Sequence, residues 1–239
     1  MSEDGLDRRL LRIEDLHAFY GESHVLKGVD LDVGRGEVVT LLGRNGAGKT
    51  TTLKSIMGMV KRRTGRIWFA DQNLAGLLPE RIARLGIAYC PEERGIFASL
   101  TVDENLLLPP VVRAGGMPVD DIYALFPNIR GRGSSQGTKL SGGEQQMLAM
   151  ARILRTGASV LLLDEPTEGL APTIVQQIGR VVRELKAKGF TILLVEQNFR
   201  FAASVADRHY VIESGRVVDC VPAADLEARM PSLIEYLGV

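Results

Sequence analysis

The first part of the chain alternates hydrophobic and polar positions. Leucine, isoleucine and valine recur there with period two, which is typical of strands that bury one face; examples are Leu11, Ile13, Leu31 and Val33. Gly21 and the pair Gly34 and Gly36 mark turns between these stretches. The pattern predicts an antiparallel β region over about residues 1–36.

Beyond residue 36 the apolar residues form short unbroken runs instead. β-rich runs without alternation are typical of strands buried on both faces of a parallel sheet; they cover residues 38–42, 87–90, 160–163 and 191–195. Helical spacing connects the last two runs, with apolar residues three or four positions apart at Ile174, Ile178, Val182 and Leu185. A hairpin around residues 213–215 and an amphipathic helix from residue 223 follow. We therefore expect an α/β fold with a parallel core and an antiparallel edge.

The segment from residue 92 to residue 140 differs from the rest of the chain. Proline and glycine interrupt it at 109–110, 115–118 and 126–127, and short helical stretches such as 102–108 lie between them. The 49 residues of this segment are too few to bury a core of their own. We expect a helical insertion into the α/β domain.

Composition narrows the class of protein. The chain has 239 residues, 45% of them hydrophobic, with 29 basic and 29 acidic residues. This balance gives no support to bulk binding of nucleic acid, which requires a basic surface. No window approaches the roughly 18 apolar residues of a membrane helix, and the N-terminus lacks the apolar segment of a signal peptide. The sequence predicts a cytosolic globular protein with a single domain over residues 1–239.

A glycine-rich segment follows the first unbroken apolar run and precedes a helical stretch at 51–59. Residues 43–50 match G-x-x-x-x-G-K-[ST], in which backbone N–H groups and a helix N-terminus form a nest for phosphate. We expect the lysine to reach the β and γ phosphates and the threonine after it, Thr50, to ligate Mg²⁺. A strand-to-helix turn without a ligand would not require the Lys-Thr pair. The predicted nucleotide-binding residues here are Gly43, Arg44, Asn45, Gly46, Ala47, Gly48, Lys49, Thr50 and Thr51.

Two carboxylates end the apolar run at 160–163. A carboxylate at the C-terminal edge of a strand can hold Mg²⁺, and a neighbouring one can polarise an attacking water as a general base. The pair alone is also typical of a solvated loop, but its combination with the phosphate loop favours chemistry. We expect Asp164 to bind the metal and Glu165 to activate the water.

Residues 140–146, Leu-Ser-Gly-Gly-Glu-Gln-Gln, open another helical run. Ser141 and Glu144 have the spacing of a capping box, which by itself explains a well-formed helix start. The two glycines between them, Gly142 and Gly143, are not needed for a capping box and leave backbone N–H groups free for a phosphate. The combination predicts a second nucleotide contact by these four residues.

Residues 140–146 resemble the signature motif of ATP-binding-cassette (ABC) ATPases, and the order of phosphate loop, signature and Asp164-Glu165 is similar to that family over essentially the whole chain. The resemblance implies a P-loop NTPase fold, with a RecA-like parallel core, an antiparallel β edge subdomain and an inserted helical subdomain over about residues 92–152. It also implies that two such domains pack head to tail, with ATP between the phosphate loop of one and the signature of the other. Tyr20 would stack on adenine; the alternative is an ordinary packed aromatic.

Three segments depart from the commonest pattern of that family. Glu92 follows the strand at 87–90 where glutamine is usual, and it can still ligate Mg²⁺ although it adds negative charge beside a phosphate. Gln197 replaces the usual histidine after the last core strand, and its amide can donate to the γ phosphate but cannot titrate. Residues 168–171 read Glu-Gly-Leu-Ala in place of Ser-Gly-Leu-Asp. We expect Glu165 and Gln197 to be the catalytic residues.

Residues 91–97, 168–172 and 194–198 resemble one of the two ATPase subunits of bacterial branched-chain amino-acid importers, whose close relatives import urea and short-chain amides. The resemblance implies an ATP- and Mg²⁺-dependent ATPase that pairs with a second, paralogous ATPase subunit, or with itself in isolation. Two membrane permeases and, indirectly, a periplasmic solute-binding protein would complete the importer, and no nucleic acid is expected. The permeases would hold the chain at the cytoplasmic face of the cell membrane, with the helical segment from Glu92 toward them.

Two other functions use parts of the same pattern. A soluble ABC protein that acts on ribosomes or DNA usually carries two cassettes or long coiled-coil insertions, and neither is evident in this sequence. A nucleotide kinase or GTPase shares the phosphate loop but gives no reason for residues 140–146. A motor subunit, in which ATP binding closes a dimer and hydrolysis releases it, is the preferred interpretation.

Overall fold

Two β-sheets organise the chain in the computed structural model, which describes residues 9–237. The strands of the antiparallel sheet lie in the order β2 (Ser23–Gly34), β1 (Arg9–Tyr20), β4 (Arg62–Phe69) and β5 (Gln72–Asn73). Those of the larger core sheet lie in the order β10 (Arg216–Pro222), β9 (Arg208–Glu213), β3 (Val38–Leu42), β8 (Thr191–Glu196), β7 (Val160–Asp164) and β6 (Ile87–Cys90).

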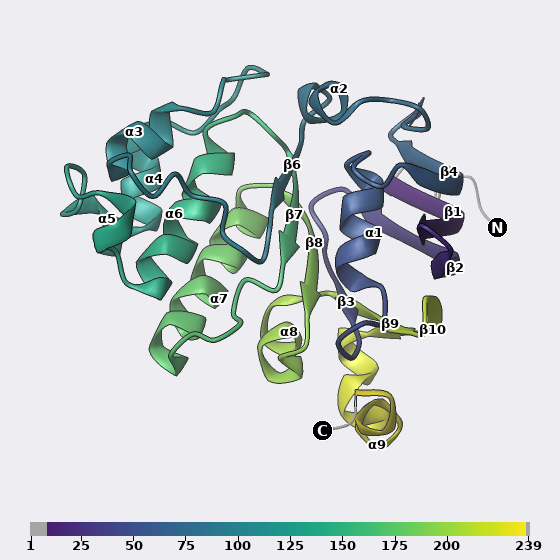
Figure 1. Cartoon of the computed structure of the whole chain (residues 1–239). Helices are drawn as coiled ribbons and strands as arrows, with labels where there is room; N and C mark the ends of the chain where they lie inside the picture. The colour runs from purple at the N-terminus through teal and green to yellow at the C-terminus, as the bar shows by residue number, and fades with distance from the viewer. Residues whose placement is uncertain (1–8, 238–239) are drawn as a thin grey trace.

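The helices lie against both sheets and form most of one end of the molecule. α1 (Lys49–Ile56) lies between the two sheets, and α2 (Pro79–Arg84) lies next to β6 at the edge of the core sheet (Figure 1). The opposite end holds α3 (Val102–Leu107), α4 (Val119–Leu125), α5 (Pro127–Arg130) and α6 (Gly142–Leu154). The remaining helices are α7 (Pro172–Ala187), α8 (Phe199–Val205) and α9 (Leu226–Leu237).

Four neighbouring strands of the core sheet are the four unbroken apolar runs of the sequence. β3, β8, β7 and β6 all run parallel, and β9 continues the parallel sheet on the other side of β3. β10 pairs antiparallel with β9 across the hairpin at residues 213–216. The prediction of an α/β fold with a parallel core and an antiparallel edge is confirmed.

Both faces of the core sheet are covered, which explains why its strands do not alternate in polarity. Along β8, Leu193 and Val195 pack into a hydrophobic cluster with residues of β1, β2 and α1. Ile192 and Leu194 point to the other face and pack into a second cluster with residues of α6 and α7. The core sheet is therefore a fixed layer from which the loops at its carboxyl end project.

The antiparallel sheet is larger than the alternating pattern indicated. Ile13 of β1 lies opposite Leu31 of β2 on one side and opposite Ile67 of β4 on the other. β4 reads Arg-Arg-Thr-Gly-Arg-Ile-Trp-Phe, so only its last three residues carry an apolar signal. The sheet therefore draws two strands, β4 and β5, from beyond residue 36.

Residues 1–8 and 238–239 lie outside the described part of the chain. The expectation that the N-terminus carries no signal peptide therefore falls almost entirely on residues outside the described part. Within residues 9–237, none of the helices combines the length and the apolar character that crossing a membrane requires.

His209 of β9 is a fully buried titratable residue in the core sheet. Its Nδ1 lies 2.6 Å from Thr40 Oγ1 on β3, and its Nε2 has no hydrogen-bond partner among the described residues. Burial lowers the pKa of His209 to about 4, because a charged imidazolium would lose its hydration there.

The stability of the fold is expected to fall as the pH drops from about 6.5 to about 4. In that window the unfolded chain, with the ordinary histidine pKa of about 6.5, binds a proton at residue 209 that the folded chain does not. Between pH 7.5 and pH 5 the wild type should lose about 2 kcal/mol of unfolding free energy relative to His209→Gln. Urea unfolding of both proteins at the two pH values measures this; an identical pH dependence would contradict it.

Candidate nucleotide-binding site

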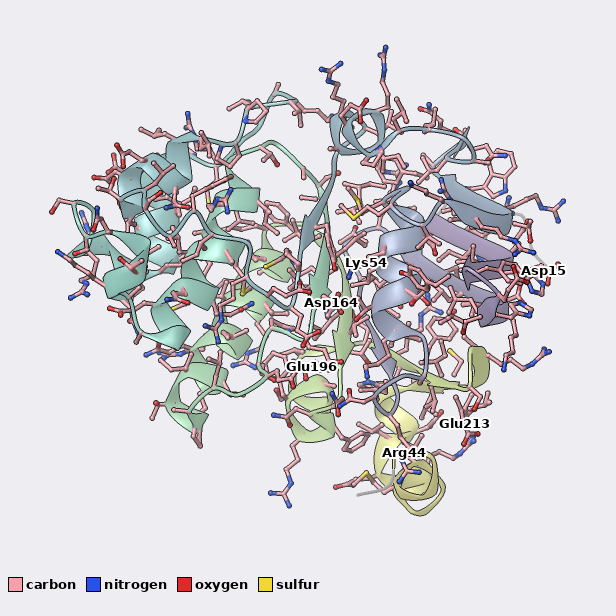
Figure 2. The ribbon with its side chains drawn as sticks, in the orientation of Figure 1. Asp15, Arg44, Lys54, Asp164, Glu196 and Glu213 are labelled. Carbon is pink, nitrogen blue, oxygen red and sulfur yellow. The ribbon has the colours of Figure 1, made fainter. Side chains whose placement is uncertain are left out.

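Loops from three parallel strands meet at the carboxyl end of the core sheet. The loop at 43–48 follows β3, Glu165 follows β7, and Gln197 follows β8. Figure 2 shows Asp164 and Glu196 at this end of the sheet, where β7 and β8 finish. The carboxyl ends of parallel strands are where open α/β sheets bind their ligands.

The loop between β3 and α1 has a backbone that only glycine fits at several positions. Gly46 and Gly48 have φ angles of +79° and +111°, which other residues rarely adopt. A Cβ atom on Gly43 would lie 2.4 Å from the carbonyl oxygen of Ile212. α1 then begins at Lys49 without a side-chain cap, so the N–H groups of its first turn remain available to a phosphate.

Lys49 is bound inside the site by three oxygen atoms. Its Nζ donates to the carbonyl oxygens of Gly43 at 2.8 Å and Arg44 at 3.1 Å. It also forms an ion pair with Glu165 Oε1 at 3.0 Å, and the two side chains are only 3% and 7% exposed. The ammonium group therefore lies directly at the phosphate loop, with a carboxylate as its counter-ion.

Glu165 links the phosphate loop to the loop after β8. Gln197 Nε2 donates to Glu165 Oε2 at 2.7 Å and also donates to Asn45 Oδ1 in the phosphate loop. Burial alone would raise the pKa of Glu165, but the hydrogen bonds from Gln197 and Lys49 and the charge of Lys49 lower it below its ordinary value. The carboxylate is therefore ionised at neutral pH, as a general base must be.

Asp164 is held by two hydroxyl groups on its two oxygen atoms. Thr50 Oγ1 donates to Oδ1 at 2.9 Å and Tyr89 OH donates to Oδ2 at 2.7 Å. Burial raises the pKa of Asp164, and the two hydrogen bonds oppose this change. A hydroxyl and a carboxylate beside a phosphate loop are the hard oxygen ligands that Mg²⁺ prefers, so Thr50 and Asp164 fit this metal ion.

A cavity of about 470 Å³ lies over these residues. Eight of the predicted site residues line it, together with two residues not predicted to bind, Val25 and Glu168; the eight are Asn45, Gly46, Gly48, Lys49, Thr50, Thr51, Glu92 and Glu165. Arg44 and Ala47 line a smaller neighbouring cavity of about 210 Å³ with residues 212–214. Contact with Glu165, burial and the charges of Glu165 and Glu92 raise the pKa of Glu168 to about 7.

Tyr20 and the signature residues lie apart from this cavity. Tyr20 ends β1 with 50% of its surface exposed, and it does not line the cavity. Ser141 N donates to Glu144 Oε2 at 2.7 Å and Glu144 N donates to Ser141 Oγ at 3.3 Å, so the capping box is present. Neither residue lines the cavity. Nucleotide contacts by Tyr20 and by residues 141–144 stay predictions.

The two glycines of the signature motif, Gly142 and Gly143, also lie close to other residues of the same chain. A Cβ atom on Gly143 would lie 2.9 Å from Ile174 of α7, and one on Gly142 would lie 3.3 Å from the Arg94 guanidinium. Arg94 donates to Gln145 Oε1 at 3.0 Å. Close packing against Ile174 therefore favours a glycine at position 143 whether or not a phosphate binds there, whereas the Arg94 side chain could shift to admit a Cβ at position 142.

Two polar residues of the site were missed by sequence reasoning. Tyr89 holds Asp164, and Glu196 accepts hydrogen bonds from residues beside Glu165 and Gln197. Both lie inside or at the end of apolar runs, where the sequence pattern alone does not indicate that a polar residue has a role in the site. A polar side chain at the carboxyl end of a buried strand was the available signal.

Comparison with known proteins agrees with this arrangement. The ABC transporter family matches residues 26–168. The chain is 41% identical over 238 residues to the high-affinity branched-chain amino acid transport ATP-binding protein BraG of Pseudomonas aeruginosa, covering 96% of this chain and 100% of that protein. It is 35% identical over 213 residues to the lipopolysaccharide export system ATP-binding protein LptB of Escherichia coli, covering 87% of this chain and 88% of that one.

Solved structures show the same fold. The crystal structure of a nucleotide-free ATP-binding cassette from an ABC transporter superposes with a TM-score of 0.84 at 25% identity, covering 97% of this chain and 99% of that one. An ATP-binding subunit of an ABC transporter is 31% identical, with a TM-score of 0.78 and coverage of 96% and 100%. The chain belongs to the ABC transporter family and is its ATP-binding, ATP-hydrolysing cassette.

Proposed function

We propose that this chain is the motor subunit of an ABC importer for branched-chain amino acids. It would work at the cytoplasmic face of the membrane, bound to two permeases that a periplasmic solute-binding protein supplies. A second cassette, a paralogue or another copy of this chain, would complete the nucleotide sites. The observation that supports this most is full-length similarity at 41% identity to a branched-chain amino acid transport ATP-binding protein.

Other relatives support different solutes. LptB proteins, named for lipopolysaccharide export, are 32% to 35% identical to this chain over about 87% of its length. The branched-chain amino acid proteins, at 40% and 41%, are more similar, and this difference favours import of amino acids. A urea or short-chain amide importer is the nearest alternative within the same group, and a soluble ABC ATPase is more distant.

The geometry supports a division of roles in binding. Lys49 is paired with Glu165, and the β and γ phosphates of ATP would give its ammonium a stronger partner. Thr50 and Asp164 would hold Mg²⁺, which neutralises charge on the phosphates when bound. Glu92 lines the same cavity and would be a further acidic oxygen ligand for that ion.

The same contacts support a division of roles in hydrolysis. Transfer of Lys49 to the phosphates would free Glu165 to accept a proton from the attacking water. Gln197, which contacts both Glu165 and the phosphate loop, would orient that water or donate to the γ phosphate. An amide does not titrate near neutral pH, so Glu165 would be the sole titrating base of the pair.

The second nucleotide contact would come from another cassette. Residues 141–144 do not line the cavity formed by residues 45–51 of the same chain, which supports a contact made across two chains. Closing two chains head to tail would bring each signature to the opposite phosphate loop. ATP would thus stabilise the closed pair by contacts that exist only in that state.

Lys49→Ala should abolish nucleotide binding by this chain. The substitution removes the only ammonium that lines the cavity among the described residues and leaves Glu165 buried without its counter-ion, so ATP affinity should fall at least about 100-fold. Titration calorimetry with ATP and Mg²⁺ measures the affinity. Lys54→Ala, on the last turn of the same helix, is the matched control and should bind normally; normal binding by Lys49→Ala would refute the role of the phosphate loop.

Glu165→Gln should retain ATP binding but lower turnover in the assembled complex about 100-fold or more, because the general base is lost. The variant should accumulate as an ATP-bound pair of cassettes. Size-exclusion chromatography with ATP measures the pairing, and phosphate release measures the turnover. Wild-type turnover by this variant would mean that hydrolysis occurs elsewhere in the complex.

Ser141→Arg should stop solute uptake by vesicles that contain the complete transporter with its binding protein. The arginine would fill the space in which a partner's phosphate must lie. Glu80→Arg is the control, since Glu80 is exposed in the first turn of α2, outside the segment expected to face the permeases. Full uptake of radiolabelled leucine by vesicles with the Ser141→Arg variant would contradict the head-to-tail site. Failure of vesicles with the wild-type transporter to take up any branched-chain amino acid would contradict the proposed solute.

A further inference from the structure

Glu196, the last residue of β8, is a buried carboxylate that the roles above do not use. Its side chain is 2% exposed, and it does not line the nucleotide cavity. Oε1 accepts hydrogen bonds from Thr167 Oγ1 at 2.7 Å and from Thr167 N at 3.2 Å. Oε2 accepts from Asn198 N at 3.1 Å. Both oxygen atoms are therefore occupied by donors from two different loops.

The two loops are those that carry the catalytic residues. Thr167 lies two residues after Glu165, and Asn198 directly follows Gln197. The backbone makes a further link, since Glu165 N donates to Val195 O at 2.9 Å. Glu196 therefore connects, beneath the cavity, the same two loops that the Glu165–Gln197 hydrogen bond connects inside it.

A carboxylate is the group this position requires. Two main-chain N–H groups and one hydroxyl point at it, and only a group with acceptors at both ends satisfies donors on both sides. Burial raises the pKa of Glu196 to about 7, against the effect of the hydrogen bonds from Thr167 and Asn198. Burial of a charge away from water costs free energy. The three hydrogen bonds offset this cost, and they explain why a carboxylate occupies this position.

The backbone of Glu165 has a further need for such support. Its φ angle is +44°, in the left-handed region that residues with a side chain rarely adopt, and such a conformation persists only when surrounding contacts hold it. The hydrogen bonds from Thr167 to Glu196 fix the chain two residues beyond this point. They are the nearest side-chain contacts that hold the loop after Glu165.

We propose that Glu196 is a positioning residue for hydrolysis, which aligns the general base Glu165 with Gln197 by holding the loops that carry them. It does not contact nucleotide, so its effect is on the chemical step and not on ATP binding. The inference rests on the proposed role of Glu165 as the base. A displacement of about 1 Å of a catalytic group can lower a rate by about 100-fold, which is the scale on which such a residue acts.

The test compares Glu196→Gln with wild type in the assembled transporter. The amide keeps the size of the side chain but presents an N–H group to one of the donors, so at least one of the three hydrogen bonds is lost. We expect kcat for ATP to fall at least about 10-fold while KM for ATP, and ATP affinity of the isolated subunit, stay within about twofold. A kcat within twofold of wild type would overturn the proposal, as would an equal loss of ATP affinity.

A second variant covers the case in which Glu196→Gln does not fold. Thr167→Val removes the hydroxyl donor and keeps the shape of the side chain; it should give the same loss of kcat with unchanged KM, and wild-type kcat would overturn the proposal. Thr191→Val is the matched control for stability, because Thr191 is buried at the other end of β8 and accepts a hydrogen bond from Gly36 N. It should lower the melting temperature without changing kcat.

Glu165→Gln, measured in the same assay, separates this inference from the proposed function. If that variant hydrolyses ATP at the wild-type rate, hydrolysis occurs elsewhere in the complex, and the inference fails together with the proposed role of Glu165 as the base. If it is inactive while Glu196→Gln and Thr167→Val turn over normally, only the positioning role fails.

Discussion

The ion pair between Lys49 and Glu165 is the interaction on which the site depends. Both side chains are almost completely buried and their charged atoms lie 3.0 Å apart. A buried charge without a partner destabilises a protein by several kcal/mol, so each residue keeps the other in place between β3 and β7. In the role proposed above, an anionic ligand would replace the carboxylate as the partner of Lys49, and this exchange would release Glu165.

The core sheet makes this pairing possible. Its parallel strands carry apolar side chains on both faces, and the residues of β8 pack alternately toward α1 and toward α7. A strand fixed on both faces cannot move to relieve strain at its end. The loops after β3, β7 and β8 are therefore held at constant separations, and the hydrogen bonds of Asp164, Glu165 and Gln197 form across them.

Much of the fold follows from local sequence patterns, and the differences have physical causes. The four buried strands are evident because continuous apolar runs occur where both faces are covered. β4 carries little apolar signal because five of its eight residues are polar or glycine, although it pairs with β1 from Leu11 to Phe19. The phosphate loop and Asp164-Glu165 could be named from spacing, whereas Tyr89 and Glu196 could not, because their hydrogen-bond partners lie 75 and 29 residues away in the sequence.

The contact between Gly143 and Ile174 has a consequence for how α6 packs against α7. A methyl group on Gly143 would overlap the Ile174 side chain, so the first turn of α6 lies backbone-to-side-chain against α7. A side chain at position 143 would therefore push the first turn of α6 away from α7 or displace Ile174. The separation of these two helices thus depends on the absence of a side chain at a single position.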